Sequence, residues 1–547
     1  MRLLAAPAYQ ERKRHTATKI AAVAAPLLYN PAPQTIPTED LPLRPPARCW
    51  ILLVLASLTL SALAQTPEEK TSRHLDAIRD QPSLLLAFLR DLPKGGDLHN
   101  HLAGAIYAEN WIDFSANANL CVDRSTSTLL APPCDKTCSS FANKPAVRCA
   151  YDDHILYGQL VDAWSMRNWS RADESGHDHF FASFDKFRMA ELTSAGDQLA
   201  EVSARAAADK LQYLELMHTA DDMRSAELGA KLGWNEDFGK MRQALLAGGL
   251  REIASETRTQ LDRDEAKRSQ LLRCGTAQAA PGCAVTVHYL YQVLRGLPKE
   301  MVFAQMVLGF ELAQSDPRFV GLNLVMPEDW YIPRHDFDLH MREIDFLHAL
   351  YPKVRITLHA GELAFGLVPP EDLRFHIRES IEKGHAERIG HGTSVMQEHD
   401  AIGLLEEMAQ RNILVEICLT SNDTILGVSG QNHPFPIYRK FGVPVAFSTD
   451  DEGVSRSDMT QEYLRGTQTY GLTYADLKGM ARQSLEHSFL PGDSLWFDAK
   501  LFKLVAACAD AQPGTLSSSC QSFLNASEKA RTQWKLEEEF VKFENKN

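Results

Sequence analysis

Arg355–Glu362, with the sequence RITLHAGE, is the segment of the chain that indicates its fold most clearly. Its first residues alternate polar and apolar side chains, a pattern typical of a strand buried in a sheet. The strand ends at Ala360-Gly361, a small pair that allows a tight turn and the close approach of a ligand. We therefore expect a buried strand that brings a candidate metal ligand, His359, and a candidate acid–base group, Glu362, to the carboxyl end of a sheet.

Similar apolar segments recur along the chain, with segments of helical character between them. Eight such segments are found, at residues 97–102, 211–217, 284–293, 319–325, 354–360, 387–392, 413–422 and 443–451. Eight strands, each followed by a helix-type connection, predict an α/β fold of the TIM type, a (β/α)8 barrel. A doubly wound open sheet is the alternative, but the chain lacks the glycine-rich phosphate loop that would favour it.

The other segments are arranged around this barrel, which we expect to occupy residues 65–495. A cysteine-bearing irregular stretch and the helical segments after it, about residues 106–190, are predicted to form an insertion after the first strand. Residues 496–547 are predicted to form a C-terminal helical extension. Its last helix is amphipathic, so it either packs on the barrel or contributes to a homodimer contact.

Residues 1–64 are predicted to be a leader and signal peptide. Arg44 and Arg48 precede the apolar run Trp50–Ala64, which ends in the small-x-small pattern of Ala62-Leu63-Ala64. The run is shorter than the roughly 20 apolar residues of a membrane span, although an uncleaved anchor is the alternative. We expect an exported protein, periplasmic or extracellular, with no membrane segment in its mature form.

The cysteines agree with export. Ten are present, and eight of them lie in short local groups: Cys121, Cys134, Cys138 and Cys149; Cys274 and Cys283; Cys508 and Cys520. Such groups suit local disulfides in an oxidising compartment, although Cys134 and Cys138 could also be half of a zinc site. Cys49 lies in the leader, and Cys418, inside an apolar segment, is expected to be a buried free thiol.

Composition limits the class of ligand. The 547 residues are 44% hydrophobic and 23% charged, as in ordinary globular proteins, and the formal net charge is −14. Nucleic-acid phosphates are bound by basic faces, so we expect no nucleic-acid partner. A small neutral or cationic molecule fits this charge better.

Histidines and aspartates end several of the predicted strands. His99 and His101 are two residues apart on the first strand, so both rings point to the same side. Asp450 and Asp451 end the last strand, and in a barrel such groups converge with His359 at one mouth. Three neutral imidazoles and one carboxylate suit zinc, with one position left open for water.

Glu362 and His391 are the groups expected beside this metal. Zinc lowers the pKa of a bound water to about 7. Glu362, enclosed in a pocket, could protonate a ring nitrogen of the molecule under attack. His391 could orient the attacking oxygen or serve as another metal ligand. Two-metal hydrolases usually bridge their ions with a modified lysine, which segment 319–325 lacks, so one metal per chain is favoured.

Five motifs resemble, in order and spacing across residues 92–455, the adenosine deaminase family of metal-dependent hydrolases. They are DLHNHLAGA (97–105), LHAGE (358–362), RIGHGTSV (388–395), EICLTSN (416–422) and VAFSTDD (445–451). The opening LPKGGDLHNH, the apolar leader and the cysteine-bearing insertion are most similar to the secreted, growth-factor-related branch of that family. The other zinc deaminase pattern, H-x-E with P-C-x-x-C, is absent from the sequence.

The resemblance implies the same barrel and the hydrolytic deamination of adenosine or 2′-deoxyadenosine, a hydrolase reaction on a C–N bond of a cyclic amidine. It implies that Glu362 protonates purine N1, that His391 positions the hydroxide, and that Asp451 hydrogen-bonds purine N7. It also implies one zinc ion per chain, with four ligands: His99, His101, His359 and Asp450.

Two positions depart from the family pattern. Ala103 replaces an aspartate that would contact the ribose, and Met326 replaces a glycine whose backbone amide would contact purine N3. Together with Asp451 and Gly361, these residues are predicted to line the substrate site. The departures leave open a hydrolase of another aminopurine or a pterin-like heterocycle. A signalling or binding relative with little turnover is the other alternative.

Overall fold

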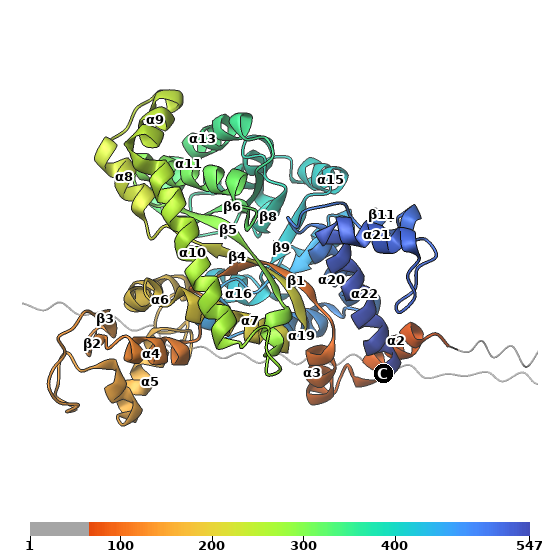
Figure 1. Ribbon diagram of the computed structural model, residues 1–547, viewed down its shortest axis with the longest axis horizontal. Coiled ribbons are helices and arrows are strands. Elements are labelled where there is room, and N and C mark those ends of the chain that lie inside the picture. The colour runs from red at the N-terminus through yellow and green to blue at the C-terminus, as the bar shows by residue number, and fades with distance from the viewer. Residues whose placement is uncertain (1–64) are drawn as a thin grey trace, which may run out of the picture. The chain divides into compact units, whose positions relative to one another are not determined.

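An eight-stranded parallel sheet forms the centre of the protein in a computed structural model that describes residues 65–547 (Figure 1). The strands lie side by side in sequence order, and each pairs in parallel with the next. They are β1 (Gly95–His101), β4 (Leu211–His218), β5 (Thr286–Leu294), β6 (Phe319–Val325), β7 (Arg355–Ala360), β8 (Arg388–His391), β9 (Leu414–Ile417) and β10 (Val445–Phe447).

The first and last strands meet at a single bridge just beyond β10. There Asn100 pairs in parallel with Asp450. The Asp450 N–H donates to the His99 carbonyl at 2.9 Å, and the His101 N–H donates to the Asp450 carbonyl at 3.3 Å. These bonds bring the two edges of the sheet together, which confirms the predicted TIM-type barrel.

Helices connect the strands and surround the sheet (Figure 1). After β4 come α8 (Arg224–Leu232), α9 (Phe238–Leu245) and α10 (Arg251–Leu271). The later connections contain α11 (Lys299–Ser315), α12 (Tyr331–His335), α13 (Phe337–Leu350), α14 (His376–Glu382), α15 (Ala401–Arg411), α16 (Leu419–Leu426) and α17 (Phe435–Phe441). The last strand leads into α18 (Glu452–Ser455), α19 (Met459–Tyr470) and α20 (Tyr474–Glu486).

Some predicted elements differ from the observed ones. The expected strand 413–422 ends after four residues at Ile417, and Asn422 lies on α16 because its N–H bonds back to the Cys418 carbonyl at 2.9 Å. The expected strand 443–451 is similarly short, with three residues, Val445–Phe447, and beyond it the Thr449 hydroxyl donates to Asp97 of the adjoining strand β1.

The segment between β1 and β4 is the predicted insertion, and it has an apolar cluster of its own. Its helices are α4 (Ala108–Asn117), α5 (His154–Ala163), α6 (Gly176–Glu191) and α7 (Ala195–Ala208), with a hairpin of β2 (Cys121–Asp123) and β3 (Thr128–Leu130). Trp111, Trp164 and Phe187 are buried in this cluster. Disulfides Cys121–Cys134 and Cys138–Cys149 close its irregular part.

The two ends of the described chain lie beside the barrel. α2 (Pro67–Ile78) and α3 (Pro82–Asp91) precede β1. After α20 come the pair β11 (Trp496–Asp498) and β12 (Lys503–Leu504), then α21 (Ser518–Ala526) and α22 (Glu528–Lys546). The last helix, α22, packs against α2 and α20, so the C-terminal extension is helical and covers the barrel as predicted. The homodimer contact stays a prediction.

Two further disulfides join Cys274 to Cys283 and Cys508 to Cys520, and Cys418 is a buried free thiol, as expected. The predicted leader and signal peptide, with Cys49, lies outside the described residues. Among residues 65–547, no helix combines the length and the apolar composition that crossing a membrane requires.

A buried ionic cluster fills the barrel below its mouth. The Arg388 guanidinium of β8 donates to Glu215 of β4 and to Glu416 of β9, both at 2.6 Å, and all three side chains are at most 1% exposed. It also donates to the His487 carbonyl at 2.9 Å. Two carboxylates without this cation would be left buried and unpaired, so Arg388 holds strands from opposite sides of the barrel together.

Replacement of Arg388 by methionine should therefore destabilise the protein by about 3–5 kcal/mol, because it leaves buried carboxylates without a partner. Arg411→Met is the matched control. Arg411 pairs with Glu407 on the surface of α15 and is 43% exposed, so its loss should cost less than about 1 kcal/mol. Urea unfolding of both variants measures the difference, and equal midpoints would contradict the assigned role of the cluster.

Candidate active site

The carboxyl ends of the strands bring the predicted histidines and aspartates to one mouth of the barrel. His99 and His101 end β1, His359 lies in β7, His391 ends β8, and Asp450 follows β10. The ring of His99 lies 4.4 Å from that of His359 and 4.8 Å from that of His391, measured between centroids. Residues separated by some 350 positions thus form one cluster.

The Nε2 atoms of three histidines face a common point beside Asp450. His101 Nε2 lies 3.2 Å from His359 Nε2. Asp450 Oδ1 is 3.3 Å from His101 Nε2 and 3.6 Å from His99 Nε2. The cluster therefore presents three ring nitrogens and a carboxylate oxygen to the same small volume.

The opposite nitrogen, Nδ1, of each of these rings has an oxygen acceptor. The pairs are His99 with Glu416 at 2.7 Å, His101 with Gln292 at 2.9 Å, and His359 with Asn323 at 2.9 Å. Asn323 Oδ1 also accepts the backbone N–H of His359, which fixes the orientation of its amide. A neutral imidazole that donates through Nδ1 has a free lone pair on Nε2, so in their neutral forms all three rings offer a lone pair to the centre. Burial opposes a charge on His99 and His101, but Asp450 and Glu416 raise the pKa of His99 to about 10, and Asp451 and Asp450 raise the pKa of His101. These carboxylates therefore favour a positive charge at the centre.

This donor set fits a divalent metal ion. His99 Nε2 is buried and has no hydrogen-bond partner among the described residues. Burial lowers the pKa of His359 well below its usual value, which keeps that ring neutral. Converging lone pairs repel each other unless a cation lies between them, and nitrogen with carboxylate oxygen is a ligand set that zinc accepts.

Position alone allows two choices for the third histidine. The ligand atoms of His99, His359, His391 and Asp450 lie within 4.8 Å of one another, and those of His101, Asp450 and Asp451 form a second such group. His101 and His391 are therefore both close enough to take part. The distances between these atoms therefore do not show which of the two histidines would bind the metal and which would donate a hydrogen bond.

Glu362 follows β7 on a loop that a buried carboxylate holds in place. The N–H groups of Gly361 and Glu362 donate to the Glu328 carboxylate at 3.1 and 2.7 Å, and His376 bonds to the same carboxylate. Burial tends to raise the pKa of Glu328, but His376 and Arg295 lower it to about 2. Glu328 was missed by the sequence analysis, although it lies in the segment MPED after the fourth predicted strand.

The Glu362 carboxyl has a strongly shifted pKa. Burial raises it well above its usual value, and the neighbouring carboxylates of Asp450 and Glu328 raise it further. Its Oε1 lies 3.8 Å from His391 Nε2. A carboxyl that keeps its proton at neutral pH can act as a general acid.

Several residues of the site have backbone conformations that favour glycine. His391, Asp450 and Met326 have φ angles of 65°, 60° and 84°. Such strain in non-glycine residues persists where the surrounding structure imposes it, and it is concentrated at functional sites. The angle at Met326 explains why glycine suits this position in the family that the sequence resembles.

Gly104 allows a close approach that the sequence analysis did not single out. A Cβ atom on Gly104 would lie only 1.5 Å from Asp451 Oδ1. Its carbonyl also accepts the N–H groups of Gly453 and Val454, both at 3.0 Å. The loop after β1 therefore packs directly against the Asp451 carboxylate and holds it in place.

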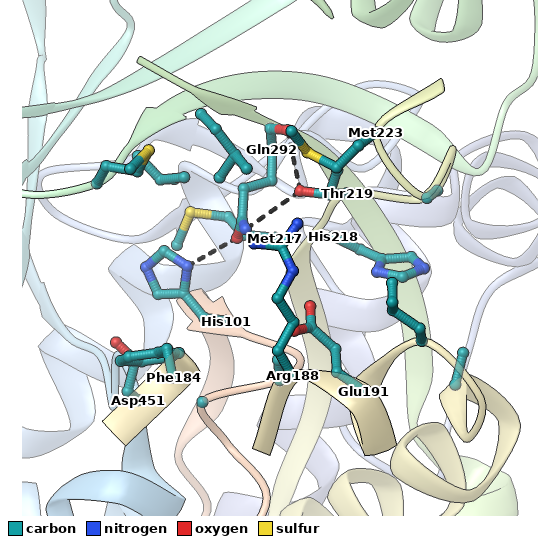
Figure 2. Close-up of a pocket in the computed structure, with 18 of the residues that line it drawn as sticks. His101, Phe184, Arg188, Glu191, Met217, His218, Thr219, Met223, Gln292 and Asp451 are labelled. Carbon is teal, nitrogen blue, oxygen red and sulfur yellow. Dashed lines mark hydrogen bonds between the residues drawn. The ribbon is translucent and has the colours of Figure 1, made fainter. Parts of the chain in front are cut away.

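A cavity of about 360 Å³ opens from this cluster. Ala103, Met326 and Asp451, three of the four residues expected at the substrate site, line it together with Glu362, whereas Gly361 is buried beside it with its N–H bonded to Glu328. Figure 2 shows His101 and its hydrogen bond to Gln292, which in turn bonds to Thr219. His99 and His391 are fully buried behind the lining.

The far part of the cavity is formed by the insertion and the loop after β4, which the sequence analysis did not connect with the site. Figure 2 shows Phe184, Arg188 and Glu191 of α6 in this wall, with His218 and Met223 nearby. These residues are more than 80 positions from the motif residues after β1. No local pattern in the sequence marks them as lining residues.

Comparison with known proteins agrees with this geometry. The family model described as adenosine deaminase matches residues 161–496, more than half of the chain. The chain therefore belongs to the adenosine deaminase family. The secreted, growth-factor-related branch stays a prediction.

Individual relatives match over shorter stretches. The adenosine deaminase of Clostridium perfringens is 33% identical over 136 residues, 25% of this chain and 38% of that protein. That of Yersinia pseudotuberculosis is 35% identical over 138 residues, again 25% and 38%. The matches thus span well under two thirds of these relatives. A crystal structure of an amidohydrolase from Burkholderia ambifaria, with bound Zn, covers 82% of this chain and 95% of its own, at 16% identity and a TM-score of 0.49.

Proposed function

We propose that the protein is a zinc-dependent hydrolase that deaminates adenosine or 2′-deoxyadenosine to the inosine product and ammonia. The observation that carries the proposal is the convergence of three histidine Nε2 atoms and the Asp450 carboxylate beside the buried carboxyl of Glu362, whose pKa burial raises well above its usual value. This cluster opens into a cavity of about 360 Å³, a size suited to a nucleoside. Membership of the adenosine deaminase family supports the same reaction.

The metal ligands we assign are His99, His101, His359 and Asp450, with one zinc ion per chain. Zinc, when bound, supplies Lewis-acid activation of water at neutral pH. The Nδ1 partners of the three rings, Glu416, Gln292 and Asn323, hold the rings in the orientation that this requires.

The residues around the metal would carry the proton transfers. Water would add to C6 of the purine through its oxygen while Glu362 gives its proton to N1, and one proton of the water would then return to the Glu362 carboxylate. The amino group on C6 would take a proton from Glu362 and leave as ammonia as the C6–N bond breaks. The proton of the new C6 hydroxyl would restore Glu362 and leave a C6 carbonyl. His391 orients the attacking water through Nε2, and Asp451 hydrogen-bonds N7. General acid–base catalysis of this kind contributes roughly 10²–10⁴-fold to a rate.

The charge of the cavity favours a nucleoside over a nucleotide. Away from the metal end, its lining carries four acidic and two basic side chains: Asp185, Arg188, Glu191, Asp222, Asp264 and Lys267. Lys267 already pairs with Asp197. A 5′-phosphate would therefore meet an excess of negative charge, whereas a 5′-hydroxyl would not. Ala103 and Met326 in the lining favour, as the second candidate, another aminopurine or pterin-like heterocycle.

We also propose that the protein is exported and acts in the periplasm or outside the cell. Four disulfides among the described residues support an oxidising compartment. The predicted signal peptide supports the same conclusion from the sequence.

Two substitutions separate the acid from a metal ligand. Glu362→Gln should retain one zinc per chain and the native fold but lose at least about 10²-fold in kcat, because it removes a proton donor and no ligand. His359→Ala should lose zinc and activity together. Metal analysis with an ammonia-release assay on adenosine tests both variants. A Glu362→Gln enzyme within about tenfold of the unmodified rate would contradict the assigned acid.

The substrate preference follows from Ala103 and from the acidic lining. We expect kcat/KM for adenosine to exceed that for AMP by more than about tenfold. 5′-Deoxyadenosine should be used within about tenfold of adenosine, because Ala103 has no side-chain group to bond the 5′-hydroxyl and any one remaining hydrogen bond is worth only about 0.5–1.5 kcal/mol. Ala103→Asp should sharpen the preference for a free 5′-hydroxyl. A hundredfold rejection of 5′-deoxyadenosine by the unmodified enzyme would show that another residue makes this contact.

A further inference from the structure

We propose that Asn422 and His433 are positioning residues that fix the proton of His391 on Nε2. This inference rests on the proposed function, because it explains how His391 differs from the three histidines assigned as ligands. His391 lies close enough to His99, His359 and Asp450 to join a metal site. What distinguishes it is the group that faces its Nδ1.

A backbone amide, which can only donate, fixes the tautomer of His433. The N–H of Phe435 donates to His433 Nδ1 at 3.1 Å. Because a peptide N–H can only donate, this Nδ1 carries no proton. Burial lowers the pKa of His433 to about 4, so the ring is neutral at neutral pH and its one proton lies on Nε2.

The proton on His433 then fixes the amide of Asn422. His433 Nε2 lies 3.0 Å from Asn422 Oδ1 and donates to it. The opposite orientation of the amide would place two donors against each other. The Asn422 amide nitrogen therefore faces His391 Nδ1, at 3.0 Å, and donates to it. The three side chains are at most 2% exposed, so this chain of hydrogen bonds runs through the protein interior.

His391 therefore has the opposite tautomer to the neutral rings of the three proposed ligand histidines, which carry their proton on Nδ1. Its Nδ1 accepts a hydrogen bond, so a neutral ring carries its proton on Nε2. That atom points toward Glu362 Oε1 at 3.8 Å and Asp450 Oδ2 at 3.9 Å, and it has no hydrogen-bond partner among the described residues. A ring with this tautomer can donate to an oxygen in the site but has no Nε2 lone pair for a metal.

The hydrogen bonds at Nδ1 thus distinguish the proposed metal ligands from the proposed hydrogen-bond donor, which the distances between the Nε2 atoms do not. Oxygen acceptors face Nδ1 of His99, His101 and His359, whereas an amide donor faces Nδ1 of His391. Asn422 lies on α16 and His433 just before α17, so both belong to the connection between β9 and β10. This connection therefore determines which ring nitrogen of His391, the last residue of β8, carries the proton.

The direct test is nitrogen NMR of the full-length protein labelled with ¹⁵N-histidine, in metal-free and zinc-loaded forms. Protonated and unprotonated ring nitrogens have well separated shifts, and the signals of His391 are identified by their loss in His391→Gln. We expect a protonated Nε2 for His391 and a protonated Nδ1 for His359. A protonated Nδ1 on His391 in the unmodified protein would overturn the proposal.

Substitution of Asn422 tests the cause. In Asn422→Asp the carboxylate only accepts, so the His391 proton should move to Nδ1. Asn422→Leu removes the donor without adding charge and should abolish the preference for either tautomer. Asn422→Asp should lower kcat by at least about 10²-fold, whereas Asn422→Leu should lower it only a few-fold, because a large share of its His391 rings keep the proton on Nε2. KM should change little in either variant, because His391 lies behind the cavity lining. One zinc per chain should remain in Asn422→Leu.

Ser421→Ala is the matched control. Ser421 is a buried neighbour whose hydroxyl has no partner among the described residues, and its loss should leave the tautomer and kcat unchanged. If both Asn422 variants keep a protonated Nε2 and the unmodified kcat, Asn422 does not position His391. The NMR result does not depend on turnover. If the protein deaminates no purine, the proposed function is refuted, while the NMR spectra still decide the tautomer of His391.

Discussion

The backbone of Asp450 is the point on which the structure depends, because it closes the barrel. Its N–H and carbonyl bond to the backbones of His99 and His101, the two histidines that end the first strand. The same three residues supply side chains to the candidate metal site. The backbone bonds that close the sheet therefore also bring these side chains together. The positive φ of Asp450 is a local cost that this closure imposes.

Buried polar groups extend from this seam into the barrel and connect stability with function. Glu416 accepts from Arg388 through one carboxylate oxygen and from His99 through the other. The ionic cluster that joins opposite strands therefore also orients a proposed ligand. Glu328 has a comparable part on the other side of the mouth, where it holds the loop that carries Glu362. The orientation of His99 and the position of Glu362 thus depend on buried partners outside the cavity.

Periodicity and spacing were enough to predict the barrel, because strand alternation and the i, i+2 relation of His99 and His101 are local properties of the chain. The wall formed by α6 could not be predicted, because it reaches the site only through the folded arrangement of the insertion. The sequence predicts that Asn422 lies at the end of a strand, whereas it lies on a helix. The apolar segment before it continues without any residue that marks the turn at Cys418. Glu328 is an acidic residue after a predicted strand, which by itself is a weak indication of a role in the site. Its partners are distant in the sequence and come together only in the fold.

We propose that one metal ion at this seam makes the protein a deaminase. Full-length protein freed of metal and titrated with zinc tests it most directly, with ammonia release from adenosine as the measure. We predict no activity without metal and a linear rise that stops at one zinc per chain. Full activity in the metal-free protein, or a rise that continues to two equivalents, would contradict the account.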